Sequence, residues 1–166
     1  MTFKINVSFF SNSRSEFGLI NQIIQKLKKY KKFKYTIFLS GTHFSNKYGN
    51  SLNEIKSANV KYASVFKYSL NEASEKNIIK NLSLNTINLS QVFKNVDNVV
   101  LFGDRIDLYP IALNCLIYNT KIIHFGGGEE TRGSIDDKVR KFISSIADLH
   151  FVSSKNYKKN LIKTGI

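Results

Sequence analysis

Residues 98–129 read NVVLFGDRIDLYPIALNCLIYNTKIIHFGGGE, and they decide the fold of the chain. NVVLF is a short apolar run of the kind that forms a buried strand, and KIIHF is a second one. Between them, LYPIALNCLIYN is long enough for an apolar helix, and Pro110 is tolerated in its first turn. A strand, a helix and another strand in this order predict a parallel βαβ unit.

Apolar runs and helical patterns alternate along the rest of the chain. The expected strands are residues 4–10, 35–40, 62–68 and 149–154, and the expected helices are residues 19–27, 51–59, 74–93, 136–147 and 154–165. This alternation predicts an α/β fold, a parallel sheet with helices on both faces. No linker, low-complexity tract or repeat divides the chain, which predicts one domain spanning residues 1–166.

The composition excludes several classes of protein. The chain has 166 residues, enough for one domain with a core, and 42% of them are hydrophobic, which argues against disorder. No apolar run approaches the roughly 18 residues of a membrane helix, and the N-terminus lacks a signal-peptide layout. The single Cys115 cannot form an internal disulfide, and no Cys/His cluster indicates a metal. We therefore expect a cytoplasmic protein with no metal or other cofactor.

The formal net charge is +13, which raises the question of a nucleic-acid partner. The lysines lie in QKLKKYKKFK and KNYKKNLIK, which are typical of the outer faces and ends of helices. A solvated surface is therefore favoured over a nucleic-acid groove, and an RNA-binding protein stays as an alternative argued from charge alone. A smaller anionic partner such as a nucleotide is compatible with the same charge.

Two candidate sites follow the first two strands. In SNSRSEFG, residues 11–18, Arg14 stands at a strand-to-helix turn, where backbone N–H groups favour an anion. Ser13 and Glu16 in the same turn also form a capping-box pattern, so the local chemistry leaves both interpretations open. In SGTHFSNKYG, residues 40–49, His43 follows a strand end, although a lone histidine is more often a hydrogen-bonded structural residue.

Two further candidate sites are acidic. Asp104 follows a buried strand and a glycine, where desolvation can raise its pKa toward that of a general base, and helix capping is its alternative role. Glu129 and Glu130 follow three glycines, and Asp136 and Asp137 open a helix, where acids complement the helix dipole. Carboxylates converging from different loops would instead suit proton transfer at a carbon atom.

In order and spacing, these segments resemble one family, the hydrolysing UDP-N-acetylglucosamine 2-epimerases, in particular the branch of sialic-acid and legionaminic-acid pathways. SNSRSEFG is similar to the family turn G-T-R-A-E-Y-G, and SGTHFSNKYG to the loop T-G-x-H-x-S-x-x-x-G. Residues 101–129 resemble L-G-D-R, an apolar helix and H-I-H-G-G-E. Residues 131–154 resemble T-x-G-x-I-D-E-x-I-R-H followed by a helix and L-H-F. Four motifs in order are far more specific than any one of them.

The resemblance implies a Rossmann-like parallel sheet, the N-terminal half of a glycosyltransferase-B arrangement in which two such domains face each other across a cleft. The family's second, C-terminal domain supplies much of the uridine and pyrophosphate binding, and the extent of the resemblance leads us to expect that this domain lies outside this chain. The implied substrate is a UDP-sugar with a 2-acetamido group. The proton at C2 is removed, UDP is eliminated from C1 to give a glycal, and water then adds, which leaves the free sugar inverted at C2.

The resemblance also implies roles for residues, position by position. Arg14 matches the arginine near the UDP phosphates, with Ser13 and Glu16 in the same substrate-binding turn, and His43 matches a histidine of the ligand pocket. The acid/base groups match Asp104, Glu129 and Asp136, and which of them removes the C2 proton stays open.

Three positions depart from the family pattern. Asn12 replaces the first glycine of the G-T-R turn, Gly126 replaces the second histidine of H-I-H-G-G-E, and Lys141 replaces the histidine after the I-D-E arginine. Losing two imidazoles would alter substrate choice or activity. The leading hypothesis is the N-terminal catalytic half of such an enzyme, a homo-oligomer working with a C-terminal half. The alternative is a truncated, non-catalytic nucleotide-sugar-binding domain.

Overall fold

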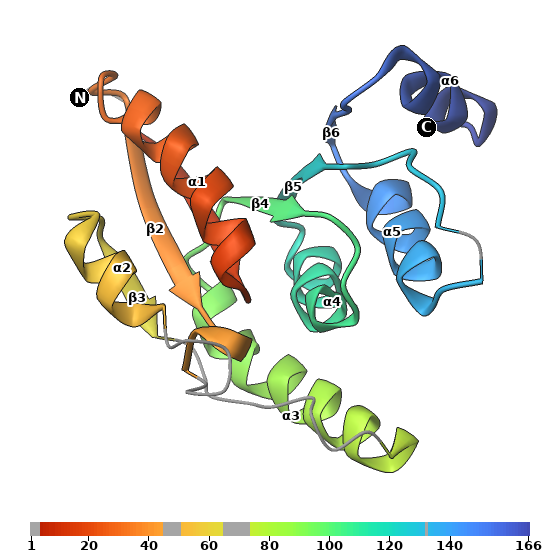
Figure 1. The fold of residues 1–166 in the computed structure, drawn as a ribbon, viewed down its shortest axis with the longest axis horizontal. Helices are drawn as coiled ribbons and strands as arrows, with labels where there is room; N and C mark the ends of the chain where they lie inside the picture. The colour runs from red at the N-terminus through yellow and green to blue at the C-terminus, as the bar shows by residue number, and fades with distance from the viewer. Residues whose placement is uncertain (1–3, 45–50, 65–73, 132) are drawn as a thin grey trace.

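In the part of the chain that the structure describes, six parallel strands form one sheet in the order β3-β2-β1-β4-β5-β6 (Figure 1). The structure is a computed structural model of the chain, and it describes residues 4–44, 51–64, 74–131 and 133–166. The strands are β1 (Ile5–Ser11), β2 (Phe33–Leu39), β3 (Tyr62–Ser64), β4 (Asn98–Phe102), β5 (Lys121–Phe125) and β6 (Leu149–Phe151). The predicted parallel α/β fold is confirmed. The strand predicted over residues 62–68 is present as far as Ser64, and its remainder lies outside the described residues.

The helices connect these strands as the alternating pattern predicts. They are α1 (Arg14–Leu27), α2 (Leu52–Ser57), α3 (Glu75–Phe93), α4 (Tyr109–Tyr118), α5 (Ile135–Ile146) and α6 (Lys155–Lys163). Serine side chains cap the N-termini of α1, α3, α5 and α6, each accepting a hydrogen bond from a backbone N–H of the first turn. Among the described residues, the short 3-10 helices Gly41–Phe44 and Ile106–Leu108 were not predicted, because each is a single turn after a strand.

The hydrophobic core has two parts, one on each face of the sheet. Neighbouring side chains of a strand point to opposite faces, so Phe9 and Phe10 of β1 enter different parts. Phe9 packs in a cluster with residues of α1 and α2, whereas Phe10 packs with residues of α3, α4 and α5. Helices therefore cover both faces (Figure 1).

The two halves of the sheet meet between β1 and β4. Ser8 and Phe9 are in register with Val99 and Val100. The Asn6 side chain extends this seam by donating to the carboxylate of Asp97 at 3.0 Å. The chain runs outward from this seam in both directions, and a sheet of this order binds ligands beyond the carboxyl ends of its strands.

Candidate functional site

An open cavity of about 660 Å³ lies where β4, β5 and β6 end. One side of α1 borders it, together with the turns that follow the three strands. Phe102, Phe125 and Phe151 present a stack of rings to it, with centroids 4.7 and 4.6 Å apart. The polar and charged residues that line it are Ser15, Glu16, Gln22, Lys26, Asp104, Arg105, Glu129 and Ser153. The cavity therefore combines an aromatic surface with acidic and basic groups.

The turn between β1 and α1 brings the predicted Glu16 to this cavity. Ser13 caps α1, and its Oγ accepts a hydrogen bond from the Glu16 N–H at 3.5 Å. The Glu16 side chain turns back, and its Oε2 accepts from the backbone N–H of Asn12 at 2.6 Å. Only 7% of Glu16 is exposed, and this burial raises its pKa to about 7. The residue is therefore both a helix cap and a cavity carboxyl that holds a proton near neutral pH.

Arg14, in the same turn, is exposed to solvent. Its Nε donates to Glu54 of α2 at 2.7 Å, and it is not among the residues that border the cavity. Ion pairs at such an exposure are weak, so the arginine is free to exchange this partner for another anion at little cost.

His43 is completely buried in the 3-10 helix after β2. Its Nε2 lies 2.8 Å from the Ser11 hydroxyl and its Nδ1 lies 2.6 Å from the Ser51 hydroxyl. Burial lowers the pKa of His43 to about 4, so the ring is neutral at physiological pH. The structure thus places this histidine between two serines rather than at the cavity, in the hydrogen-bonded structural arrangement that the sequence left open.

Arg140 joins the acidic segments of the site. It is 5% exposed, and its guanidinium pairs with the carboxylate of Asp104. The same group donates to the backbone carbonyl of Glu129 at 2.8 Å and to the Thr131 hydroxyl at 3.2 Å. One planar side chain of α5 therefore holds the turn after β4 and the loop after β5 together.

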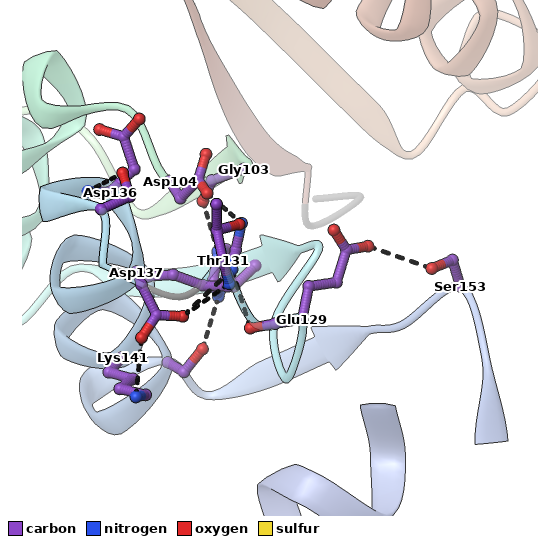
Figure 2. Close-up of polar contacts among 12 residues, drawn as sticks. Gly103, Asp104, Glu129, Thr131, Asp136, Asp137, Lys141 and Ser153 are labelled. Carbon is purple, nitrogen blue, oxygen red and sulfur yellow. Dashed lines mark hydrogen bonds and ion pairs between the residues drawn. The ribbon is translucent and has the colours of Figure 1, made fainter. Parts of the chain in front are cut away.

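The three predicted acids lie at the ends of neighbouring elements (Figure 2). Asp104 and Glu129 both border the cavity, and Glu129 Oε1 accepts from the Ser153 hydroxyl at 3.1 Å. Asp136 lies in the first turn of α5, and its backbone N–H donates to the Ser134 cap at 3.1 Å. Burial, with the nearby Asp104 carboxylate next, raises the pKa of Asp136. The fold thus brings together two acids on the cavity and a third one that interacts with Asp104.

Two of the departures from the family pattern are also placed by the structure. Gly126 borders the cavity in a left-handed conformation, with φ of +89°, and donates its N–H to the Phe151 carbonyl at 3.0 Å. Lys141 lies on the exposed side of α5 and pairs with Asp137 at 2.7 Å. A Cβ atom at position 126 would lie 3.6 Å from the Cα of Gly103, whereas Lys141 is held at the surface.

Sequence reasoning missed Arg140 and Ser153. Arg140 stands four residues after Asp136, on the same side of α5, and this spacing could have indicated it. An arginine in an amphipathic helix otherwise indicates a solvated face, and nothing local marks it as buried.

Within residues 4–44, 51–64, 74–131 and 133–166, no helix is long and apolar enough to cross a membrane. In that same part of the chain, no three His, Cys, Asp or Glu side chains are grouped so that they could hold a metal ion.

Fold and cavity together define a Rossmann-like α/β domain with an acid-lined cavity at the carboxyl edge of its sheet. Residues 25–166 match the model of the family described as UDP-N-acetylglucosamine 2-epimerase. The chain belongs to this family, as the four sequence motifs indicated.

Curated relatives support this assignment. The chain is 27% identical over 161 residues to the polysialic acid biosynthesis protein P7 of Escherichia coli, a match covering 96% of this chain and 41% of that protein. It is 31% identical over 164 residues to the GDP/UDP-N,N'-diacetylbacillosamine 2-epimerase (hydrolyzing) of Campylobacter jejuni, covering 98% of this chain and 42% of that protein. The chain therefore spans less than half the length of these relatives.

Solved structures share the fold. The UDP-GlcNAc 2-epimerase of Neisseria meningitidis bound to UDP-GlcNAc superposes with a TM-score of 0.80 at 18% identity, over 98% of this chain and 44% of that one. The epimerase of Methanocaldococcus jannaschii in complex with UDP-GlcNAc and UDP superposes with a TM-score of 0.78 at 22% identity, over 98% and 44%.

Proposed function

We propose that this chain is the N-terminal catalytic half of a hydrolysing UDP-N-acetylglucosamine 2-epimerase, or of an enzyme acting on a UDP-2,4-diacetamido sugar, in nonulosonic-acid biosynthesis. The observation that carries the proposal is the meeting of Asp104 and Glu129 at one cavity, with Asp136 beside them, in a chain of this family. Proton transfer at a sugar carbon needs more than one carboxyl group, placed around a single position.

In the proposed reaction, one carboxylate takes the proton from C2 while the C1–O bond breaks. The electron pair of the C2–H bond becomes the C1=C2 bond of a glycal, and that of the C1–O bond leaves with UDP. Water then adds its hydroxyl to C1, and a protonated carboxyl returns a proton to the opposite face of C2. Asp104, Glu129 and Asp136 together supply these groups, and the raised pKa of Asp136 suits a carboxyl that carries a proton.

Substrate binding is proposed for the β1–α1 turn and for the second loop, residues 40–49, which follows β2. Arg14 would exchange Glu54 for the diphosphate, and Ser13 and Glu16 would contribute from the same turn. His43 would act by holding the second loop, since its ring nitrogens face Ser11 and Ser51. The rest of the uridine diphosphate site would belong to a C-terminal half like those of the longer relatives.

The test uses the protein joined to its C-terminal half. It is incubated in heavy water with UDP-N-acetylglucosamine and with the 2,4-diacetamido-6-deoxy analogue, and UDP and the deuterium at C2 are measured. We expect UDP release with one deuterium at C2, and loss of both in Asp104→Asn and Glu129→Gln. Glu130→Gln, which changes the exposed neighbour, is the control and should keep the activity.

Release of UDP without deuterium at C2 would refute the elimination mechanism. Tight binding of the UDP-sugar with no release of UDP would favour the alternative, a non-catalytic nucleotide-sugar-binding domain.

A further inference from the structure

His124 of β5 is completely buried beneath the acidic site, and no role follows for it from the reaction above. Its Nε2 lies 2.9 Å from the backbone carbonyl oxygen of Gly103, and its Nδ1 lies 3.1 Å from the hydroxyl of Ser144. Gly103 immediately precedes Asp104, and Ser144 lies on α5, the helix that carries Asp136. One imidazole therefore connects the turn after β4 to α5.

The partners of the ring determine its tautomer. A carbonyl oxygen can only accept a hydrogen bond, so Nε2 carries the proton and donates to Gly103. The other nitrogen, Nδ1, is then unprotonated and accepts a hydrogen bond from the Ser144 hydroxyl. Burial lowers the pKa of His124 to about 4, so this neutral form persists at physiological pH.

The backbone of Gly103 is held at both of its polar groups. Its N–H donates to the Phe125 carbonyl at 2.9 Å, and its own carbonyl accepts from His124. Gly103 has a positive φ of +77°, and this conformation directs the chain into Asp104. A rotation of the Gly103 peptide would displace Asp104, and the two hydrogen bonds from β5 oppose that rotation.

The helix α5 holds Asp104 at a second point. Arg140, whose guanidinium pairs with the Asp104 carboxylate, stands one helical turn before Ser144. Successive turns of α5 therefore contact the Asp104 side chain directly and its backbone through His124. The turn after β4 is therefore held against α5 by two separate connections, one through Arg140 and one through His124 and Ser144.

The loop that leads to Glu129 rests on the same residues. A Cβ atom at Gly127 would lie 3.0 Å from Ser144 Oγ and 3.3 Å from His124 Nδ1. Both distances are shorter than ordinary contacts, so the loop passes against the His124–Ser144 pair with no room for a side chain. All three acid-bearing segments therefore contact this pair.

We infer that His124 is a positioning residue, which sets Asp104 and the Glu129 loop against α5 through its hydrogen bonds to Gly103 and Ser144. The inference rests on the proposed function, because it assigns His124 to the geometry of that reaction. His124 is not among the residues that border the cavity.

The first test compares two amide substitutions in the full-length enzyme. Glutamine can place its amide nitrogen near the position of Nε2 and keep the bond to Gly103, whereas asparagine reaches only as far as Nδ1. We expect His124→Asn to lower kcat on the order of 100-fold, because a displacement of about 1 Å of a catalytic group has effects of this size. KM should change little, and His124→Gln should lie closer to the wild type.

Thr120→Val is the matched control. The Thr120 hydroxyl donates to the Val96 carbonyl at 3.2 Å, a buried bond at the opposite end of β4 and β5. This variant loses a comparable hydrogen bond and should keep kcat. A loss of kcat no larger in His124→Asn than in Thr120→Val would overturn the inference. If His124→Asn does not fold, Ser144→Ala removes the Nδ1 partner, and an unchanged kcat in that variant would overturn it equally.

A second measurement does not depend on turnover. In protein labelled with ¹⁵N-histidine and with ¹³C at the aspartate carboxyls, His124 should show the Nε2–H tautomer between pH 5 and 8. The Asp104 carboxyl signal should move in Ser144→Ala and His124→Asn but not in Thr120→Val. If these signals behave as expected while the wild-type enzyme releases no UDP, the positioning is upheld and the proposed function fails. A mixture of tautomers, or an unmoved Asp104 signal, would overturn the positioning itself.

Discussion

Replacing Glu16 by glutamine should stabilise the folded protein at pH values above about 4.5, and most strongly above pH 7. The unfolded chain releases the Glu16 proton near pH 4.5, whereas the folded protein holds it until about pH 7 because the side chain is buried. Between these values the folded state binds more protons, so stability falls as the pH rises. A pKa difference of this size lowers the free energy of unfolding by about 3 kcal/mol, and this whole loss is present above pH 7.

Glutamine carries no charge at any pH and can still accept the Asn12 N–H. The free energy of unfolding, from urea denaturation at constant ionic strength, should therefore be similar for Glu16→Gln and the wild type near pH 4.5. At pH 8 the variant should be more stable by up to about 3 kcal/mol. Glu130→Gln, an exposed carboxyl, is the control and should change stability little at either pH. The reasoning is refuted if the difference between Glu16→Gln and the wild type is the same at both pH values.

Three further predictions concern packing and the acidic site. Gly128→Ala should strongly destabilise the fold, because a Cβ atom there would clash with the carbonyl oxygen of Tyr157. Gly133 has a similar positive φ but open space around it, so Gly133→Ala should lower stability less. Equal melting temperatures of the two variants would contradict this. Arg140→Lys should lower the free energy of unfolding by roughly 2 kcal/mol or more, because an ammonium cannot replace the planar guanidinium that contacts several oxygens. A denaturation midpoint equal to that of the wild type would show that Arg140 does not hold these segments together. Cys115, 1% exposed and with its pKa raised by burial, should react with a thiol reagent only in urea, and rapid labelling of the native protein would disprove it.

The fold was predictable because the hydrophobic residues of its strands and those of its helices recur with different periods and over different lengths. The runs around Val99 and Ile122 are short and apolar, and the helix between them is too long to be a strand. The carboxyl-edge location of Asp104 and Glu129 followed from the parallel sheet alone. Their grouping at one cavity could be expected without knowing any side-chain contact.

What the sequence did not reveal are the partners that come from distant parts of the chain. The burial of Glu16 is a property of the folded chain, and the pairing of Arg14 with Glu54 depends on how α2 lies relative to α1. The four-residue spacing from Asp136 was a signal for Arg140, but nothing local marks this arginine as buried. The roles of these residues in catalysis or binding stay predictions.

The seam between β1 and β4 has a consequence for synthesis on the ribosome. β2 pairs with β1 and β3, the strands made just before and just after it, but the Asn6–Asp97 contact joins residues 91 positions apart. At the usual rate of translation, β1 therefore keeps an unpaired edge for on the order of ten seconds, with Phe9 and Phe10 beside it. An exposed apolar strand edge is a site of aggregation, so the yield of folded protein should depend on translation speed and on chaperones that cover this edge.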